Sequence, residues 1–526
     1  MKLSRRQALK IGLIGGSSLA LALGVQSYQR TPANTKIEPF ERSLIIPPLL
    51  KPIRSDETTD YYEITLQKSS TEILPGLKTE IWGYNGIAPG PTIRQSEGRK
   101  SVIRFINKLG KDSQGKPINN VIHVHGMATS AAYDGYTTDY IPPDYFKDYI
   151  YPNERASILW YHDHTMDLTA RNVDAGLAGM YIVEEPEDLN LPLPKGNYDI
   201  PLILQTKRFA QDGSIIFYNQ TPDNLYGNVL LVNGVPSPKM EVARRKYRFR
   251  ILNASGGRNY QLALSQKIDS LTEGEKLIVI GSDGGLLSEP VEIVTPEQVL
   301  PVVMAERYDV IIDFSKYPLG TEVFLQNVIQ GLDFSGSVAK NAQINPIMRF
   351  DVVRSEADES EIPRQLRPVE RLSVTSNIPE RTFIFRRNQQ GKWAINGKTW
   401  DENRIDAHPQ SGAVEIWHFI NPEKGMMHPI HLHLVEAQLL DRNGEPPRPF
   451  ERGWKDVFLL NELEELRIVA RFKGSNGEKL TGKFMMHCHQ LLHEDRGMMS
   501  QFEVGDGGLD PVATAPAQPL SIMRSL

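Results

Sequence analysis

Ten of the 12 histidines in this 526-residue chain fall in four short clusters. The clusters read His123-Val124-His125, His162-Asp163-His164, His428-Pro429-Ile430-His431-Leu432-His433, and His487-Cys488-His489 followed by His493. No histidine occurs between Thr165 and Ala407, so the middle of the chain lacks these side chains. Imidazole is a common ligand for copper and zinc, and structural histidines would be scattered more evenly. The clustering therefore indicates metal sites built from both ends of the chain.

The spacing within the clusters predicts where the imidazoles point. Side chains two residues apart share one face of a β-strand. The clusters thus supply eight histidines in four same-face pairs, namely His123/His125, His162/His164, His431/His433 and His487/His489. A mononuclear site would leave too many ligands over, whereas three metal ions sharing eight imidazoles fit comfortably. We expect the four pairs to meet at an interface between the first and last parts of the chain.

Cys488 is the only cysteine, and it lies between His487 and His489. A lone cysteine is usually a small buried apolar residue. On a strand, however, this one points to the face opposite its two neighbours. One short stretch can therefore hold the thiolate of one metal site and two ligands of another, which provides a short covalent path for electrons between them.

A second ligand set surrounds Cys488. His428 precedes its pair by an odd step, and His493 and Met498 follow Cys488 in the same stretch. Two histidines, one thiolate and a weakly bound thioether form a blue-copper site. Zinc gains little from a methionine, so copper is the better candidate.

The elements that carry these residues follow a pattern that occurs three times. Each copy has an Asn-Gly pair and then a hydrophobic strand that ends in Asn. The copies are Asn85-Gly86 with residues 99–107, Asn233-Gly234 with residues 245–253, and Asn396-Gly397 with residues 412–421. Apolar residues alternate with period two in these strands, which predicts all-β sandwich domains. The alternative is that Asn-Gly marks three unrelated hairpins.

The repeats begin roughly 150 residues apart, the usual size of a domain. We therefore expect domains at residues 38–188, 189–355 and 370–505, an acidic, proline-containing linker at 356–369, and a flexible tail at 506–526. Residues 1–37 resemble an export signal and leader, since Arg5-Arg6 precedes an uncharged run from Ile11 to Val25. A twin-arginine signal is expected and a general secretory signal is the alternative. The net charge of −5 gives no indication of nucleic acid or an anionic membrane as a partner.

Longer motifs place the chain beside a known family. They are Leu159-Trp160-Tyr161-His162-Asp163-His164-Thr165-Met166 with Gly176-Leu177-Ala178-Gly179, then Gly453-Trp454-Lys455-Asp456, and the run from His487 to Asp495. With these motifs the chain resembles the multicopper oxidases, and within them the bilirubin oxidase and spore-coat-type laccase branch. The resemblance implies three cupredoxin-like Greek-key β-sandwich domains and four copper ions.

The same resemblance assigns each ligand. It gives a type 1 copper to His428, Cys488, His493 and Met498, and a type 2 copper to His123 and His431. It gives one type 3 copper to His125, His162 and His489, and the other to His164, His433 and His487. Glu494 matches a carboxylate that assists proton delivery to oxygen, and Asp134 an acid near the type 2 copper.

We therefore expect an exported, periplasmic or extracellular, monomeric laccase-like enzyme without a membrane anchor once the signal is removed. It would take single electrons from phenols, aromatic amines, bilirubin-like pigments or metal ions and reduce O₂ to water. Bilirubin oxidases carry a tryptophan where this chain has Met426 and Met427, which puts bilirubin as the substrate in doubt. Copper nitrite reductases usually have two domains and lack the paired ligands. A non-catalytic cupredoxin scaffold, or a copper-storage or envelope protein, is the remaining alternative, because some relatives have lost their ligands.

Overall fold

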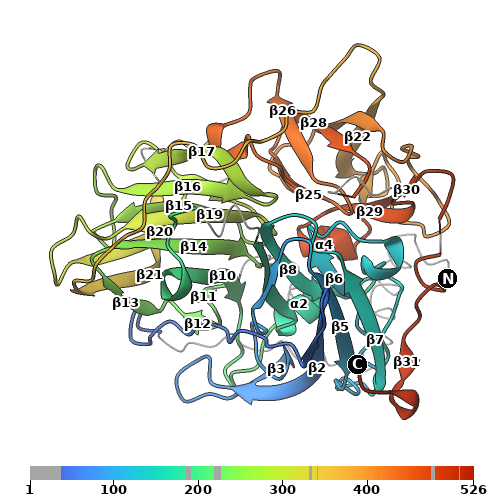
Figure 1. Ribbon diagram of the computed structural model, residues 1–526, viewed down its shortest axis with the longest axis horizontal. Helices are drawn as coiled ribbons and strands as arrows, with labels where there is room; N and C mark the ends of the chain where they lie inside the picture. The colour runs from blue at the N-terminus through green and yellow to red at the C-terminus, as the bar shows by residue number, and fades with distance from the viewer. Residues whose placement is uncertain are drawn as a thin grey trace, which may run out of the picture.

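The computed structural model describes residues 37–184, 191–217, 227–330, 334–339, 342–474, 480–508 and 510–526. Apart from Ile37, the expected export signal lies outside these residues. Strands dominate the described chain, which confirms the predicted all-β class (Figure 1). No helix among the described residues is long and apolar enough to cross a membrane.

The first segment forms two sheets that enclose one apolar core. The larger sheet contains β1 (Arg54–Ser55), β2 (Thr59–Thr71), β3 (Thr79–Tyr84), β5 (Lys100–Asn107), β7 (Tyr145–Tyr151) and β31 (Gln518–Pro519). The smaller sheet contains β4 (Ile93–Ser96), β6 (Ile122–His125), β8 (Ser157–Asp163) and β9 (Ala178–Glu184). The short helices η1 (Ala131–Tyr133) and α2 (Thr169–Ala175) connect these strands.

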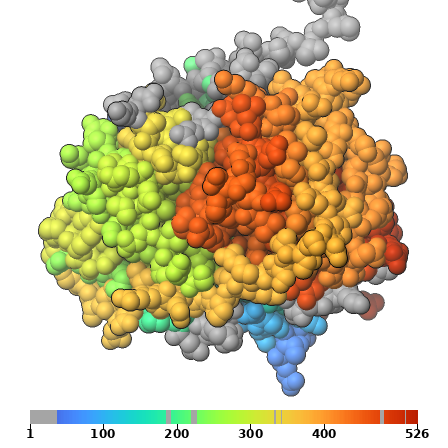
Figure 2. Space-filling view, turned by 90° about the horizontal axis from the view of Figure 1, so that it is seen from above, coloured from blue at the N-terminus to red at the C-terminus, as the bar shows by residue number. Residues whose placement is uncertain are grey.

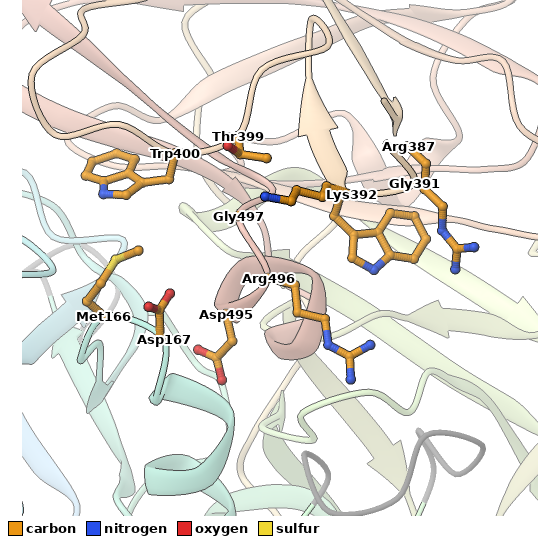
Figure 3. A pocket seen from close by; sticks show the side chains of 11 residues that line it. Met166, Asp167, Arg387, Gly391, Lys392, Thr399, Trp400, Asp495, Arg496 and Gly497 are labelled. Atoms are coloured by element: carbon orange, nitrogen blue, oxygen red, sulfur yellow. The ribbon is translucent and has the colours of Figure 1, made fainter. Parts of the chain in front are cut away.

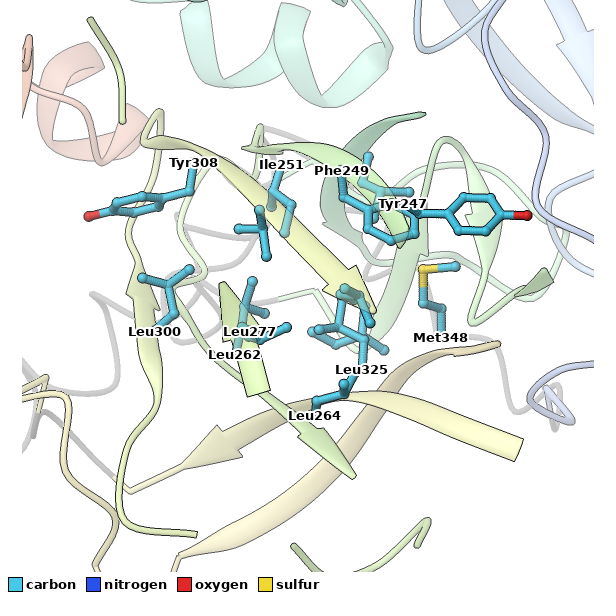
Figure 4. Packing of buried hydrophobic residues seen from close by; sticks show 14 of the residues in the cluster. Tyr247, Phe249, Ile251, Leu262, Leu264, Leu277, Leu300, Tyr308, Leu325 and Met348 are labelled. Atoms are coloured by element: carbon cyan, nitrogen blue, oxygen red, sulfur yellow. The ribbon is translucent and has the colours of Figure 1, made fainter. Parts of the chain in front are cut away.

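The second segment begins with the short helix η2 (Gly196–Tyr198). It repeats the arrangement of two sheets, with more strands in each sheet. One sheet contains β10 (Asp199–Lys207), β11 (Val229–Val232), β12 (Val235–Pro236), β14 (Lys246–Asn253), β16 (Lys276–Ser282), β17 (Gly285–Val294) and β19 (Arg307–Asp313). The other contains β13 (Lys239–Ala243), β15 (Tyr260–Ser265), β18 (Leu300–Val302), β20 (Glu322–Ile329) and β21 (Gln343–Arg354). Figure 4 shows Tyr247, Phe249 and Ile251 of β14 in the core with Leu262 and Leu264 of β15, as the period-two pattern predicts.

The third segment again has two sheets around a single core. One contains β22 (Glu380–Arg387), β23 (Trp393–Ile395), β24 (Val414–Asn421), β26 (Ala437–Arg442) and β28 (Glu464–Arg471). The other contains β25 (His428–Leu432), β27 (Val457–Leu460), β29 (Gly482–Cys488) and β30 (Met499–Val504). The helices are η4 (Pro449–Glu451), α4 (Leu491–Asp495) and, near the C-terminus, η5 (Leu520–Ile522). α4 packs against α2 of the first segment (Figure 1). The third segment also packs against the second through η4, and the two lie beside each other in Figure 2.

The three Asn-Gly pairs have the same structure, so they are copies and not unrelated hairpins. Both residues of every pair have positive φ, as a tight turn requires. The Asn side-chain oxygen accepts a backbone N–H from an earlier strand each time, from Thr65 of β2, Ile203 of β10 and Ile384 of β22 at 2.7 to 2.9 Å. That earlier strand pairs in parallel with the strand that ends in Asn, as in β2 with β5, β10 with β14 and β22 with β24.

The tail after residue 505 differs from the flexible segment that its composition predicts. Gln518 pairs with Phe146 of β7, and the Leu520 N–H donates to the Asp144 carbonyl at 3.0 Å. The Arg104 side chain donates to the carbonyl of Arg524. Backbone pairing with an edge strand therefore holds the tail against the first domain, an interaction that side-chain composition does not reveal.

Candidate metal centre

Four strands carry the paired histidines. β6 runs antiparallel to β8 with His123 opposite His162, and β25 runs antiparallel to β29 with His431 opposite His487. Each pair of strands therefore places two histidines side by side. The other four extend the group: His125 is the last residue of β6, and His164, His433 and His489 directly follow the last residues of β8, β25 and β29. The eight imidazoles are each at most 1% exposed and lie where the first domain meets the third. The structure thus brings together all four predicted pairs.

The ring nitrogens converge at distances that suit metal binding. Nε2 of His123 lies 3.3 Å from Nε2 of His431. Nε2 of His487 lies 3.3 Å from Nε2 of both His164 and His433. Two imidazole nitrogens bound at about 2 Å to one ion, at a near-tetrahedral angle, lie roughly 3.3 Å apart. Both groupings combine ligands from the first and third domains, so the sites exist only at the interface.

A third grouping contains His125, His162 and His489. The ring centroids of His125 and His162 lie 5.0 and 5.3 Å from that of His489. Nδ1 of His125, Nε2 of His162 and both nitrogens of His489 are buried and have no hydrogen-bond partner. Buried polar atoms are rarely left unpaired. Three buried imidazoles, each with at least one unpaired nitrogen, are therefore a donor set that fits a metal ion.

The opposite nitrogen of most of these rings is fixed by the protein. Nδ1 of His123 donates to the Asp134 carbonyl at 2.6 Å, and Nδ1 of His431 to the Asp456 carbonyl at 3.0 Å. Nε2 of His125 donates to the Asp456 carboxylate at 2.9 Å. Because a carbonyl or carboxylate can only accept, these contacts set the tautomer and leave the other nitrogen free to bind metal.

Burial favours the neutral form of His162 and His428, which is the form that binds metal. Burial, together with the neighbouring His164, lowers the pKa of His162 to about 3. Burial alone lowers the pKa of His428 to about 3. Neutral imidazoles present lone pairs at any moderate pH, so metal binding need not displace protons from them.

The second predicted site forms around Cys488 in the core of the third domain. Its Sγ lies 3.4 Å from Nδ1 of His428 and 3.5 Å from Nδ1 of His493. Met498 is fully buried in the same core, and its carbonyl accepts the Cys488 N–H at 3.1 Å. Burial raises the pKa of the Cys488 thiol, so a bound cation must replace the proton for the thiolate to form.

The strand β29 ends as the alternation predicts. His487 and His489 lie in the interfacial cluster, while Cys488 between them packs into the core of the third domain. His428 at the start of β25 lies with Cys488, and His431 lies with the interfacial group. The Cys488 site and the interfacial histidine cluster therefore lie on opposite sides of the end of β29.

The two predicted acids also lie at the cluster. Oδ2 of Asp134 accepts from Nδ1 of His433 at 2.8 Å, while its Oδ1 is buried without a hydrogen-bond partner, 3.7 Å from Nδ1 of His123. The Glu494 carboxylate lies 2.9 Å from Nδ1 of His487 and 3.6 Å from Nδ1 of His164. Burial would raise the pKa of Glu494, but the adjacent histidines hold it well below its usual value.

Sequence reasoning missed Asp456 and Arg307. Asp456 contacts His125 and His431, and both of its oxygens accept from the Arg307 guanidinium, at 2.7 and 2.5 Å. Asp456 belongs to the motif Gly453–Asp456, so its position was visible although its role was not. Arg307 lies in the domain without histidine ligands, and no local pattern marks it. The middle domain nevertheless reaches the metal centre through this side chain.

A cavity of about 850 Å³ opens beside the Cys488 site (Figure 3). Its lining includes Trp393, Trp400, Arg387, Lys392, Arg496 and Met166. The sequence indicated none of these as site residues. The ring of Trp393 stacks on His493 with centroids 3.7 Å apart. Neither Met426 nor Met427 is among the described lining residues, and Met427 packs in an apolar cluster instead.

The arrangement has counterparts among known proteins. Two protein-family models, both described as multicopper oxidase, match residues 65–188 and 364–508. A bilirubin oxidase from Albifimbria verrucaria is 37% identical over 84% of this chain and 76% of its own. A laccase from Bacillus subtilis (strain 168) is 36% identical over 89% of this chain and 99% of its own.

The chain is also similar to a solved laccase structure and to a cell division protein. A solved laccase from Pediococcus acidilactici superposes with a TM-score of 0.78 at 31% identity, covering 90% of this chain and 96% of its own. The cell division protein FtsP of Xenorhabdus nematophila is 32% identical over 97% of this chain and 100% of its own. Similarity of overall sequence therefore extends both to oxidases and to a protein named for another process.

Proposed function

Because this chain belongs to the multicopper oxidase family and is an oxidase that uses oxygen as acceptor, we propose that it is laccase-like and uses four copper ions. Small reducing substrates such as phenols, aromatic amines, bilirubin-like pigments or metal ions would each give one electron at the Cys488 site. The observation that carries the proposal is the completeness of the ligand sets, with eight interfacial imidazoles and a separate thiolate site.

The residues present fit copper by their chemistry. His428, Cys488, His493 and Met498 would hold the type 1 ion, and the interfacial histidines the other three. Copper supplies one-electron redox chemistry at the thiolate and reduction of O₂ to water at the cluster. A thioether beside a thiolate and two imidazoles has little use for zinc.

The chain itself positions the electron path and the protons. Cys488 is bonded directly to His487 and His489, so electrons leaving the thiolate reach the cluster through a few covalent bonds. Glu494 lies against His487 and His164, and Asp134 against His433, so both side chains are placed to pass protons to the space between the rings. Four protons are consumed for each O₂ reduced to water.

The direct test is purification of the copper-loaded protein. We expect about four copper ions per chain, a strong blue absorbance from the thiolate and oxygen uptake with a phenolic donor. Cys488→Ser should abolish the blue colour and turnover together, with the interfacial histidines still intact. Oxygen uptake that survives this substitution would exclude Cys488 as the point where electrons arrive.

The alternative is a non-catalytic scaffold, and the similarity to FtsP is the observation that favours it. A scaffold has no need for buried, unpaired ring nitrogens such as those of His489. The two functions differ in one measurement. A scaffold would bind copper weakly or not at all and would show no oxygen uptake with any donor in a panel of bilirubin, a phenol, Fe(II), Cu(I) and Mn(II).

We also propose that the chain is exported by the twin-arginine route and acts as a monomer. The support is the Arg5-Arg6 pair before an uncharged run. Arg5→Lys together with Arg6→Lys should keep the protein inside the cell, whereas unchanged export would indicate the general secretory route. A sedimentation measurement tests the monomer.

A further inference from the structure

We propose that Trp393 is the residue a reducing substrate touches, and that it passes the electron to His493. We propose further that the cations around the cavity select conjugated donors that carry a carboxylate or sulfonate group. This inference rests on the proposed function and names the substrate class of the same site.

Trp393 lies between the cavity and the Cys488 site. It is 6% exposed and lines the cavity, whereas His493 is 2% exposed and is not among the lining residues. The indole stacks on the His493 ring at 3.7 Å and 29°, and its centroid lies 5.9 Å from that of His428. A donor in the cavity therefore meets the indole before it meets either imidazole.

Stacked rings provide a path for the electron. Electronic coupling weakens steeply across empty space, and rings in van der Waals contact leave no gap. Donor, Trp393 and His493 would form one continuous stack of conjugated groups leading to Cys488, whose Sγ lies 3.5 Å from Nδ1 of His493. Removing the indole would leave a space as wide as an aromatic ring.

The charges around the cavity indicate the class of donor. Arg387, Lys392 and Arg496 line it, and within the described chain none of the three forms an ion pair with a carboxylate. Figure 3 shows Asp495 and Asp167 on the side opposite Lys392 and Arg387. Asp495 accepts the backbone N–H groups of Thr169 and Ala170 at 2.9 and 3.1 Å, which engages its charge. The cations are therefore free to bind an anionic substituent.

Arg387 lines the cavity and also lies over the ring of Trp393. Its guanidinium lies 4.3 Å from the centroid of the Trp393 ring. An anionic group held by Arg387 would therefore bring the donor's conjugated system against the indole. The overall charge of the chain is −5, so attraction of an anion at this place requires local cations.

The electrons and protons of this transfer balance with no net change in the oxidation state of Trp393. One electron leaves the donor and crosses the stacked rings in a single tunnelling step to the Cys488 site. The indole is neither oxidised nor reduced overall, and a phenolic donor gives its proton to water. Four such transfers, with four protons, reduce one O₂ to two waters.

The first test compares Trp393→Leu with Trp400→Leu in the copper-loaded protein. Trp400 lines the same cavity, but its ring lies against Tyr136 in a tilted arrangement, with centroids 6.1 Å apart. Syringate would be mixed with each variant without oxygen, and the bleaching of the blue band followed by stopped flow. We expect Trp393→Leu to bleach at least about tenfold more slowly, with unchanged reoxidation by O₂ and unchanged band position. Trp400→Leu should slow the bleaching clearly less than Trp393→Leu does.

An unchanged or faster rate in Trp393→Leu would overturn the relay. If that variant fails to bind copper, Trp393→Phe keeps a stacked ring of smaller area, and we expect a smaller decrease with an intact band. A loss of rate in Trp400→Leu as large as that in Trp393→Leu or Trp393→Phe would assign the effect to cavity shape and would also overturn the relay.

The second test measures binding without turnover. Calorimetric titration would compare naphthalene-2-sulfonate with the uncharged 2-methoxynaphthalene. We expect the sulfonate to bind roughly tenfold more tightly, and the preference to fall with added salt. Arg387→Gln, Lys392→Gln and Arg496→Gln should each reduce it, whereas Arg386→Gln, an exposed neighbour outside the cavity, should not. Equal affinity for both compounds would overturn the assignment of donor class.

The proposed oxidase function and the proposed role of Trp393 can be contradicted separately. A wild-type protein without blue absorbance and oxygen uptake contradicts the proposed function. A blue, oxygen-consuming protein whose bleaching ignores Trp393 contradicts only the inference.

Discussion

Arg307 is the residue through which the middle domain should control metal binding. Its guanidinium donates to both oxygens of Asp456 in the third domain, and its Nε donates to the Ile158 carbonyl of the first domain at 2.7 Å. Asp456 in turn accepts from Nε2 of His125 at 2.9 Å. One side chain therefore contacts all three domains and fixes the carboxylate that orients a cluster histidine. We expect Arg307→Met to loosen this orientation while roughly preserving side-chain volume.

The size of the effect follows from burial. Arg307 is fully buried and the Asp456 side chain is 1% exposed. Removing one partner of such a pair costs about 3–5 kcal/mol, because the remaining charge is left buried. Losing the group that orients a metal-bound histidine typically lowers metal affinity by about 10–100-fold. We therefore expect the cluster to bind copper 10–100-fold more weakly, with the Cys488 site and its blue band retained.

Copper content after dialysis against a graded series of chelator concentrations measures this directly, with blue absorbance as the internal reference. Arg248→Met is the matched control. Arg248 forms a buried pair with Asp309 in the same sheet as Arg307, with its Nε 2.9 Å from Oδ1 of Asp309. We expect the control to lose stability and keep its copper. Equal copper loss in both variants would show that general destabilisation, and not orientation of His125, is responsible.

Two other sites give sharp expectations. Asp134→Asn should weaken copper binding at the interfacial cluster by about tenfold, because Oδ2 accepts from Nδ1 of His433; unchanged copper content with the same chelator series would refute this. Glu451 is buried, and its carboxylate lies 2.7 Å from the Arg442 guanidinium. Burial raises the pKa of Glu451, but the charge of Arg442 more than offsets the effect of burial and lowers the pKa to about 2, below the ordinary 4.5. The pair should therefore stabilise the fold fully above about pH 4.5 and lose this contribution as the pH falls toward 2. Glu451→Gln should flatten that part of a curve of denaturation midpoint against pH, and a curve parallel to that of the wild type would contradict the reasoning.

The sequence predicted the features that depend on local periodicity. Alternation along β29 is sufficient to separate Cys488 from His487 and His489, and the same argument separates His428 from His431. The repeated Asn-Gly pairs predicted three similar turns, because the turn chemistry itself requires positive φ.

The remaining features depend on contacts between residues far apart in the chain. Arg307 meets Asp456 across 149 positions, and nothing in the residues around Arg307 distinguishes it from other arginines in strands. Trp393 stacks on His493 through the packing of β23 against α4, and a tryptophan at the start of a strand reads as an ordinary core residue. The C-terminal tail is held by backbone pairing with β7, which composition does not record.

The short helix α4 explains why the two metal sites and the cavity must form together. His493 faces Cys488, Glu494 lies against His487 and His164, Asp495 accepts two backbone N–H groups at the start of α2, and Arg496 lines the cavity. Four consecutive residues thus reach the thiolate site, the interfacial cluster, the first domain and the donor cavity. A shift of this helix would move all four contacts at once. Docking of the first domain on the third, through Asp495, therefore sets the position of Glu494 and His493, so the interface that assembles the cluster also fixes where electrons arrive.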